Sequence, residues 1–203
     1  MTEDDARGWI GNRFGVDAVN GLERLATLVR EENDQQNLIS PASINQIWTR
    51  HILDSAQLVP LAPAEGRWID IGTGGGFPGL VVALLRPQPT LLVEPRRRRA
   101  AFLEQCVATF ALTDRVDVIA GKVEQVETEA AVISARAVAS VENLLRAALP
   151  CATMGTRWLL PRGRLGDVEL ANIRERWRGV FHVEQSLTNS DSAILVAEGV
   201  SRL

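Results

Sequence analysis

The spacing of hydrophobic positions along the chain changes after Gly66. In residues 17–30, DAVNGLERLATLVR, the apolar side chains fall on one face of a helix. The run PLAPAEG at residues 60–66 then predicts a break between two parts of the chain. We therefore expect residues 1–60 to form a helical N-terminal extension and residues 61–203 to form the main domain.

A polar stretch interrupts the predicted extension. Residues 33–40, NDQQNLIS, predict a connection between two helices. Pro41 suits the first turn of the second helix, and Ser40 suits its cap. We expect that helix to continue to the break.

Short apolar runs alternate with helical segments after the break. Helices are predicted at residues 78–85, 97–111, 141–149 and near 167–177, and strands at residues 67–71, 90–94, 115–120, 130–135 and 157–161. This alternation predicts an α/β fold with a mostly parallel sheet and helices on both faces. The last two apolar runs, residues 179–187 and 192–200, are joined by the short turn TNSDS at residues 188–192. They should pair as an antiparallel hairpin at the edge of the sheet.

Composition favours a globular protein outside the membrane. Of the 203 residues, 46% are hydrophobic and 23% are charged, which is ordinary for such a protein. The apolar run at residues 80–85 is far too short to span a bilayer, and the acidic N-terminus does not look like a signal peptide. Cys106 and Cys151 stand in apolar surroundings and are expected to be buried free thiols. We expect a cytoplasmic protein with no membrane partner.

The basic residues are distributed unevenly. A net charge of −3 argues against general coating of nucleic acid, and a GC-rich genome would by itself favour arginine over lysine. The arginines nevertheless gather at residues 96–99, 162–164 and 174–178. An acidic protein can still present one basic face to phosphates.

The densest chemical signal is the glycine-rich turn DIGTGGGFPG at residues 70–79, directly after a predicted strand. A phosphate-binding loop is excluded, because no Lys-Ser or Lys-Thr follows the glycines. Gly74, Gly76 and Gly79 satisfy the nicotinamide fingerprint GxGxxG. Asp70, Gly72, Gly74 and Gly76 satisfy the acidic-x-Gly-x-Gly-x-Gly pattern of S-adenosylmethionine sites. A glycine turn without a ligand is the third interpretation.

The charge of Asp70 favours S-adenosylmethionine over a dinucleotide. A pyrophosphate requires bare backbone amides and no carboxylate nearby, whereas the sulfonium and ammonium groups of S-adenosylmethionine are cationic. Glu94, at the end of the next predicted strand, can accept both ribose hydroxyls of either cofactor. It therefore does not discriminate between them.

Several blocks of the sequence, in order, resemble those of the bacterial 16S ribosomal RNA guanine-N7 methyltransferases, also called glucose-inhibited division protein B. The blocks cover most of residues 37–140: NLIS at 37–40, RHILDS at 50–55, DIGTGGGFPG at 70–79, RAAFL at 99–103, VE at 123–124 and ISARAVAS at 133–140. The resemblance implies a class I S-adenosylmethionine methyltransferase, with a Rossmann-like sheet that ends in the antiparallel hairpin.

The resemblance also implies roles for individual residues. Glu94 would hold the ribose, Val123 and Glu124 would meet the adenine, and Arg136 would lie at the junction of cofactor and RNA. The whole predicted cofactor-binding set is Asp70, Gly72, Thr73, Gly74, Gly76, Phe77, Glu94, Val123, Glu124 and Arg136. The predicted RNA contacts are Arg99, Arg136 and Arg162. The family often has Asp where Glu94 stands and lysine in the run where this chain has Arg162.

The implied reaction is methylation of guanine N7 in the decoding-region loop of 16S ribosomal RNA. N7 has a lone pair and no proton, so it can attack the sulfonium methyl directly, and orientation replaces a general base. We therefore expect no dedicated catalytic residue and no metal, with Arg136 and His51 in supporting roles. An arginine fork can read guanine O6. The simpler alternatives are a salt bridge for Arg136 and a structural hydrogen bond for His51.

Two other functions stay open at this point. One is a nicotinamide-dependent oxidoreductase that uses Gly74, Gly76 and Gly79, and the other is a non-catalytic RNA-binding or ribosome-assembly module on the same fold. The expected partner is 16S ribosomal RNA or the small ribosomal subunit, and the expected product of the cofactor is S-adenosylhomocysteine. Nothing in the sequence suggests a large apolar interface, so we expect a monomer.

Overall fold

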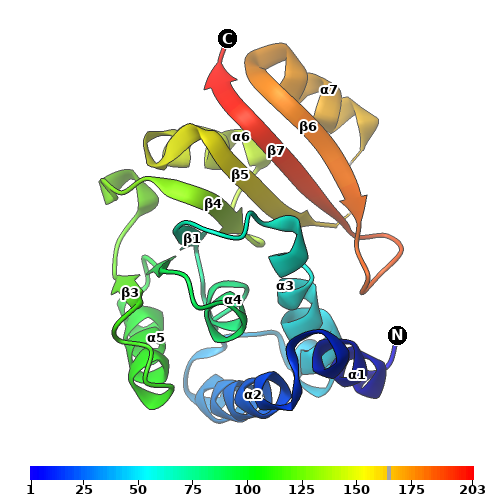
Figure 1. Cartoon of the computed structure of the whole chain (residues 1–203), viewed down its shortest axis with the longest axis vertical. Helices are drawn as coiled ribbons and strands as arrows, with labels where there is room; N and C mark the ends of the chain where they lie inside the picture. Colours follow the sequence, from blue (N-terminus) through cyan, green and yellow to red (C-terminus); the bar gives the residue numbers. More distant parts are fainter. Residues whose placement is uncertain (164–165) are drawn as a thin grey trace.

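One sheet organises the part of the chain that the structure describes, residues 1–163 and 166–203 of a computed structural model. Its seven strands lie in the order β3-β2-β1-β4-β5-β7-β6 (Figure 1). The strands are β1 (Trp68–Ile71), β2 (Thr90–Val93), β3 (Val116–Ile119), β4 (Ala130–Ala135), β5 (Ala152–Arg162), β6 (Trp177–Gln185) and β7 (Ala193–Arg202). Strands β1 to β5 pair in parallel, as the alternation of strands and helices predicts.

The predicted C-terminal hairpin is confirmed. β7 pairs antiparallel with both β5 and β6, so β6 forms the outer edge of the sheet. The hairpin turn, residues 186–192, lies on the side of the molecule that carries the short helix α3 (Figure 1), and Thr188 donates to Asp54 of that helix.

The helices cover both faces of the sheet, also as predicted. They are α1 (Glu3–Phe14), α2 (Val16–Gln36), α3 (Asp54–Ala56), α4 (Gly79–Leu85), α5 (Arg97–Thr109), α6 (Val141–Ala148) and α7 (Asp167–Arg176). One face packs against α4 and α5, with α1 and α2 as a further layer, and the other face packs against α6 and α7 (Figure 1). Alternate residues of β2 serve the two faces: Leu92 joins the first core, and Leu91 and Val93 join the second.

The N-terminal extension is helical but is built differently from the prediction. Residues 33–36 belong to α2 and not to a connection. The helix ends at Gln36, and the buried Asn33 side chain then accepts the N–H of Ile39 at 2.8 Å, which turns the chain back. Ser40 precedes the next helical segment without capping its backbone; its hydroxyl contacts that of Ser43 instead, at 3.0 Å.

The segment from Pro41 to the break is not one regular α-helix. It is a 3-10 helix, η1 (Pro41–Gln46), then a π-helix, η2 (Trp48–Leu53), and then α3. Three further 3-10 turns follow: η3 (Val59–Leu61), η4 (Val123–Gln125) and η5 (Leu149–Cys151). A π-helix widens the turn and shifts the side chains that follow, so η2 aims its residues differently from an α-helix.

Two element boundaries in the C-terminal half also differ from the prediction. β5 begins at Ala152, five residues before the predicted start, and the Thr156 hydroxyl fixes it to the carbonyl of Ala130 in β4 at 2.5 Å. Trp177 starts β6 and does not end the preceding helix. The buried indole of Trp177 joins the core on the α6 and α7 face, which favours its strand position.

The N-terminal helices share a core with the rest of the chain. Ile10, Leu25 and Trp48 lie in the same buried cluster as Leu80 of α4 and Phe102 of α5. The extension therefore packs tightly against the sheet's helical layer. The division at residue 60 stays a prediction about chain organisation.

Candidate active site

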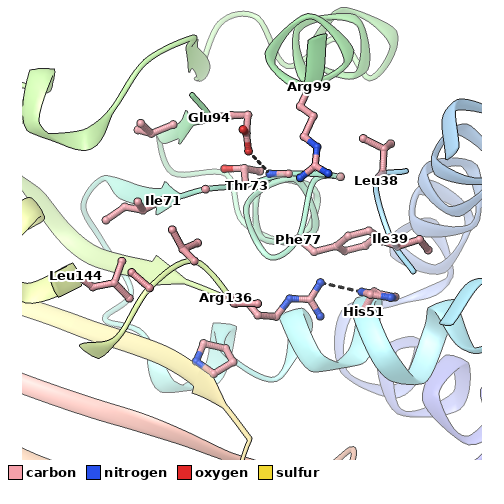
Figure 2. A pocket seen from close by; sticks show the side chains of 18 of the residues that line it. Leu38, Ile39, His51, Ile71, Thr73, Phe77, Glu94, Arg99, Arg136 and Leu144 are labelled. Carbon is pink, nitrogen blue, oxygen red and sulfur yellow. Dashed lines mark hydrogen bonds between the residues drawn. The ribbon is translucent and has the colours of Figure 1, made fainter. Parts of the chain in front are cut away.

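A cavity of about 1000 Å³ opens at the carboxyl ends of the parallel strands. Its walls come from the glycine turn after β1, the ends of β2 and β5, the segments after β3 and β4, residues 38–54 and the β6–β7 turn (Figure 2). Open α/β sheets bind ligands at this place, near the point where the strand order reverses. Here that point lies between β1 and β4.

The glycine turn brings bare backbone to the cavity. Gly72, Gly74 and Gly76 have φ values of 69°, 59° and 98°, which L-residues with side chains rarely adopt. A Cβ on Gly72 would also overlap the side chain of Val138. Gly72 and Gly74 line the cavity, while Gly76 lies behind it, where a Cβ would come within 2.8 Å of Leu80 Cδ1.

The carboxylate of Asp70 does not face the cavity. The side chain is fully buried: Oδ2 accepts the N–H of Gly79 at 2.9 Å and Oδ1 accepts the hydroxyl of Ser134 at 2.6 Å. Ser134 in turn accepts the indole N–H of Trp68 at 2.7 Å. The expectation that Asp70 lies beside the cations of a cofactor is therefore wrong, because its position in β1 points the side chain toward α4. Asp70 holds the far end of the glycine turn.

Burial raises the pKa of Asp70 to about 6, although its hydrogen bonds from Ser134, Thr73 and Gly79 oppose that change. Thr73, beside it, also lines the cavity, and its hydroxyl donates to the Asp70 carbonyl at 3.1 Å. The turn is thus fixed from inside by Asp70 and Thr73.

Glu94 fixes the same turn from the side of the cavity. It follows β2, is only 3% exposed, and accepts the N–H of Gly74 on one oxygen and the N–H of Arg96 on the other, each at 2.9 Å (Figure 2). Each carboxylate oxygen can accept a second hydrogen bond. Glu94 can therefore still accept donors from a ligand.

The remaining predicted cofactor residues also line the cavity. Val123 and Glu124 begin the 3-10 turn after β3, with Val123 buried and Glu124 exposed. Phe77 is 3% exposed and lies at the end of the glycine turn toward residues 38–51. A backbone cradle, an inward carboxylate and an apolar wall that includes Ile71, Val93 and Val123 together fit S-adenosylmethionine.

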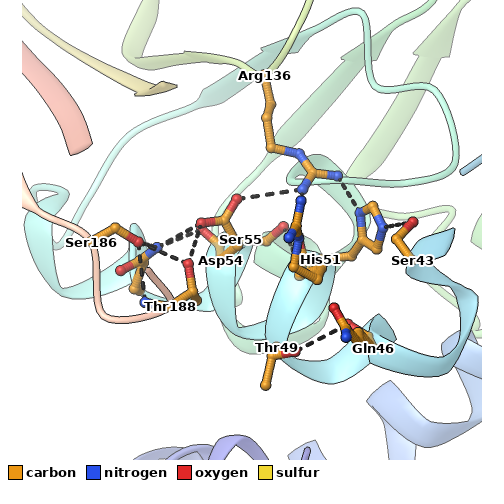
Figure 3. A network of polar contacts seen from close by, with 11 residues as sticks. Ser43, Gln46, Thr49, His51, Asp54, Ser55, Arg136, Ser186 and Thr188 are labelled. Carbon is orange, nitrogen blue, oxygen red and sulfur yellow. Dashed lines mark hydrogen bonds and ion pairs between the residues drawn. The ribbon is translucent and has the colours of Figure 1, made fainter. Parts of the chain in front are cut away.

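Arg136 and His51 meet on the opposite wall (Figures 2 and 3). The Arg136 guanidinium donates from one terminal nitrogen to His51 Nδ1 at 2.8 Å. Its other terminal nitrogen donates to the Arg50 carbonyl at 2.9 Å and lies 3.4 Å from Asp54 Oδ2. Arg136 also lies over the Phe77 ring, 5.5 Å from its centre. The predicted salt bridge and the predicted place in the cavity wall are therefore both present.

The environment keeps His51 neutral. Burial, with the positive charges of Arg136 and Arg50, lowers the pKa of His51 to about 3. The neutral ring accepts from Arg136 at Nδ1 and donates from Nε2 to the hydroxyl of Ser43 at 2.8 Å. The ring also packs on Phe77, with 5.0 Å between ring centres. Hydrogen bonding is thus the role that the structure gives to His51.

The arginine clusters separate into different environments. Arg96 and Arg99 line the cavity, and Arg99 donates to the Asn37 carbonyl at 2.9 Å (Figure 2). Arg174 donates to the Phe181 carbonyl at 2.7 Å, and Arg176 forms an ion pair with Glu142 at 3.0 Å, so both make contacts within the protein. Only some of the arginines that are clustered in the sequence therefore lie near the cavity.

Arg162 lines the cavity with a guanidinium that is only partly paired by the described residues. One terminal nitrogen donates to the Ala139 carbonyl at 2.7 Å, while Nε and the other terminal nitrogen are buried and have no partner among the described residues. Buried donors without acceptors are costly, so this guanidinium is suited to an incoming acceptor. Burial also lowers its pKa. Arg164, the other arginine of this cluster, lies outside the described residues.

Sequence reasoning missed Asp54, Ser43 and Thr188 as residues of this wall. Asp54 had a signal, because it lies within the RHILDS block that includes Arg50 and His51. No sequence signal marked Ser43 or Thr188, because only folding brings them to the cavity wall.

Comparison with known proteins settles the family. The family model described as rRNA small subunit methyltransferase G, or GidB, matches residues 18–193. The chain belongs to this family. Ribosomal RNA small subunit methyltransferase G of Sphingopyxis alaskensis is 48% identical over 202 residues, which cover 97% of this chain and 86% of that protein. The protein of the same name from Erythrobacter litoralis is 44% identical over 201 residues, which cover 98% of this chain and 97% of that one.

Solved structures agree with the fold of this methyltransferase G family member. A methyltransferase from Geobacter sulfurreducens superposes with a TM-score of 0.60 at 10% identity, covering 85% of this chain and 88% of that one. A SAM-dependent O-methyltransferase from Thermotoga maritima gives 0.58 at 15% identity, covering 87% and 72%. The class I methyltransferase fold predicted from the sequence is confirmed.

Two kinds of feature are absent from the described residues. None of the helices in residues 1–163 and 166–203 combines the length and the apolar character of a membrane span. Within the same residues, no group of three or more His, Cys, Asp or Glu side chains is arranged to hold a metal ion.

Proposed function

We propose that this chain uses S-adenosylmethionine to methylate N7 of one guanine in the decoding-region loop of 16S ribosomal RNA, in the cytoplasm. One observation carries the proposal: a single cavity joins the glycine cradle and Glu94 to the wall formed by Arg136 and His51. Family membership supports a ribosomal RNA substrate and favours S-adenosylmethionine over a nicotinamide cofactor. The choice of N7 and of the loop rests on the sequence resemblance.

The cofactor half of the cavity is the part between the glycine turn, Glu94 and Val123. The backbone of Gly72 and Gly74 would hold the methionine end, Glu94 would accept the ribose hydroxyls, and Val123 would pack against the adenine. When bound, S-adenosylmethionine supplies an electrophilic methyl group on a sulfonium. Val93 and Val123 give this part of the site an apolar surface.

The acceptor half lies beside Arg136, His51 and Phe77. Guanine N7 has no proton to lose, so this wall needs to hold the base and does not need to deprotonate it. Within the described residues, Nε–H and one further N–H of Arg136 have no protein partner, so they can donate to guanine O6. His51 already donates to Ser43 and accepts from Arg136, which leaves it suited to positioning and not to proton transfer.

Arg99 and Arg162 would neutralise the RNA backbone near the cavity. Among the described residues, two buried donor atoms of Arg162 have no protein acceptor, and phosphate oxygens are strong acceptors. Their contribution should fall with increasing salt, as phosphate contacts do.

Two measurements test the proposal together. Equilibrium dialysis should show binding of S-adenosylmethionine and much weaker binding of NADH. Tritiated methyl groups should then pass to 16S ribosomal RNA or to small ribosomal subunits, with 7-methylguanosine as the labelled nucleoside; comparing the two substrates also shows which form is used. Binding of NADH alone would point to an oxidoreductase. RNA binding without methyl transfer to either substrate would point to a non-catalytic module.

A further inference from the structure

The turn between β6 and β7 reaches the acceptor half of the cavity. Thr188, Asn189 and Ser192 line it, although they lie more than fifty residues after Arg136 in the sequence. Figure 3 shows Thr188 and Ser186 beside Asp54 on the N-terminal segment. This turn lies outside the sequence blocks that carry the resemblance, which cover most of residues 37–140.

A closed set of hydrogen bonds holds the turn in place. Gln57, which is only 4% exposed, accepts the N–H of Leu187 at 2.8 Å and donates to the Ser186 hydroxyl at 3.1 Å. The Ser186 and Thr188 hydroxyls are 2.9 Å apart. The turn is therefore docked on residues 54–57 through both its backbone and its side chains.

Asp54 connects this docking to the cavity. Its Oδ1 accepts the Thr188 hydroxyl at 3.1 Å and the Gln57 amide at 3.0 Å, while its Oδ2 lies 3.4 Å from Arg136. The side chains of Asp54 and Arg136 are only 17% and 18% exposed, so water screens this pair weakly. One carboxylate oxygen of Asp54 thus accepts a hydrogen bond from the turn, and the other forms the ion pair with Arg136.

We infer that the β6–β7 turn belongs to the RNA acceptor site and that Thr188 acts through Asp54 as a positioning residue for Arg136. The inference rests on the proposed function, in which Arg136 holds the target base. The Thr188 hydroxyl and the Gln57 amide fix the rotation of the Asp54 carboxylate. The carboxylate and His51 Nδ1 then hold the two terminal nitrogens of Arg136 in one orientation, which directs the remaining donors into the cavity.

Three variants of the full-length protein test this inference. Thr188→Val removes the hydroxyl at nearly constant volume and should lower kcat for methyl transfer about tenfold, with the Kd for S-adenosylmethionine unchanged within about twofold. Thr188→Ser keeps the hydroxyl and should recover most of the loss seen in the Val variant. Thr113→Val, at an exposed position between α5 and β3, is the matched control and should behave as the wild type.

A double-variant cycle separates positioning from general support of the fold. If Thr188 acts through Asp54, Thr188→Val should cause no further loss in an Asp54→Asn background. The inference is overturned if the two losses multiply, if Ser performs no better than Val, or if the Kd for S-adenosylmethionine rises in parallel.

A spectroscopic measurement gives an answer even where activity is too low to compare. The side-chain Nε–H signal of Arg136, assigned from its loss in Arg136→Lys, should shift in Thr188→Val and stay in place in Thr113→Val. An unshifted signal contradicts the inference. Failure of the proposed function is distinct, because the wild-type protein would then transfer no methyl group to RNA or would place it on another base or atom.

Discussion

Asp70 is fully buried and His51 is half-buried in the cavity wall, and loss of solvation moves their pKa values in opposite directions. Burial disfavours the charged form of each group, so it raises the pKa of the acid to about 6 and lowers the pKa of the base to about 3. Near neutral pH the aspartate still ionises, held by Gly79 and Ser134, while the histidine stays neutral and accepts a hydrogen bond from Arg136.

Replacement of Asp70 by Asn should change how stability depends on pH. Asp70 has a folded pKa of about 6 against 3.8 in the unfolded chain, so the folded state binds more protons between these values. This group alone therefore makes the free energy of unfolding fall as pH rises from about 4 to 6, by about 3 kcal/mol in total. His51 acts oppositely, because its pKa is lower in the folded state and its contribution is lost as pH falls below 6.5.

Urea denaturation from pH 4 to pH 7 measures the difference. In Asp70→Asn the opposing slope is gone, so between about pH 4 and pH 6 stability should rise with pH more steeply than in the wild type, by about 1.4 kcal/mol per pH unit, and above pH 6 the two curves should run parallel. Curves for the two proteins that are parallel below pH 6 as well would show that Asp70 does not carry this charge penalty.

Residue chemistry could be predicted from the sequence only where a motif fixes it. Val123, Arg136 and His51 line the cavity as their sequence blocks imply, and Glu94 lines it as its place at the end of a predicted strand implies. The charge of Asp70 predicted the same cofactor that family membership supports, but for a wrong reason. The direction of a side chain at a strand end depends on the pleat and on which helix packs against that face, and here the Asp70 carboxylate accepts the N–H of Gly79 in α4.

At the scale of elements, the glycine turn is the part whose backbone geometry is most demanding. Gly72→Ala should cost about 1–2 kcal/mol of folding free energy for the left-handed conformation alone. The new Cβ would also overlap Val138, so the turn must shift and the Kd for S-adenosylmethionine should rise at least about tenfold. Isothermal titration of the cofactor measures this change.

Two further variants test whether the effect of Gly72→Ala is specific to this turn. Adding Val138→Ala should relieve the overlap and recover part of the affinity. Gly8→Ala, in the exposed part of α1 with no atom near its Cβ, should instead stabilise the protein by about 0.5–1 kcal/mol. Unchanged cofactor affinity in Gly72→Ala would remove the glycine turn from the binding site.

Strands and the final hairpin were predictable from the sequence because short apolar runs and the TNSDS turn encode them locally. The π-helix η2 was not, and its first N–H groups are bound by Glu3 of α1, a contact that no local pattern encodes. The start of β5 was missed for a similar reason: its first residues, ATMGT, are not an apolar run, and pairing with β4 with the help of Thr156 makes them a strand.

At the scale of the whole molecule, the N-terminal helices form part of the site's support. Glu3 in α1 accepts the N–H groups of Trp48 and Thr49, at 3.0 and 2.9 Å, and the Thr49 hydroxyl at 2.8 Å. These donors lie in the first turn of η2, the segment that carries Arg50 and His51 to the cavity. Glu3 therefore caps a helix that is 45 residues away in sequence.

Glu3→Ala should lower the free energy of unfolding by about 2 kcal/mol, because it leaves partly buried donors without an acceptor. Asp4→Ala is the control: its side chain is 95% exposed, and its ion pair with Arg7 should contribute less than about 1 kcal/mol. Urea denaturation monitored by tryptophan fluorescence compares them, and equal losses in both variants would argue against the capping role of Glu3.

The contacts that unite the site could not be predicted from the sequence, because they join residues that are far apart in the chain. Thr188 and Asp54 are 134 residues apart, and Arg136 and His51 are 85 apart. The resemblance placed Arg136 and the RHILDS block in one site, but only the folded chain shows which atoms meet.

The most direct test of the proposed methyl transfer is to locate the methyl group on the RNA. Small ribosomal subunits or 16S ribosomal RNA lacking the modification would be incubated with the protein and S-adenosylmethionine, and the product cleaved selectively at 7-methylguanosine. The proposal predicts one cleavage site, at a guanine in the decoding-region loop, and none with the Gly72→Ala variant at limiting cofactor. A methyl group on another base or another guanine atom, or no methyl transfer by the wild-type protein, would contradict it.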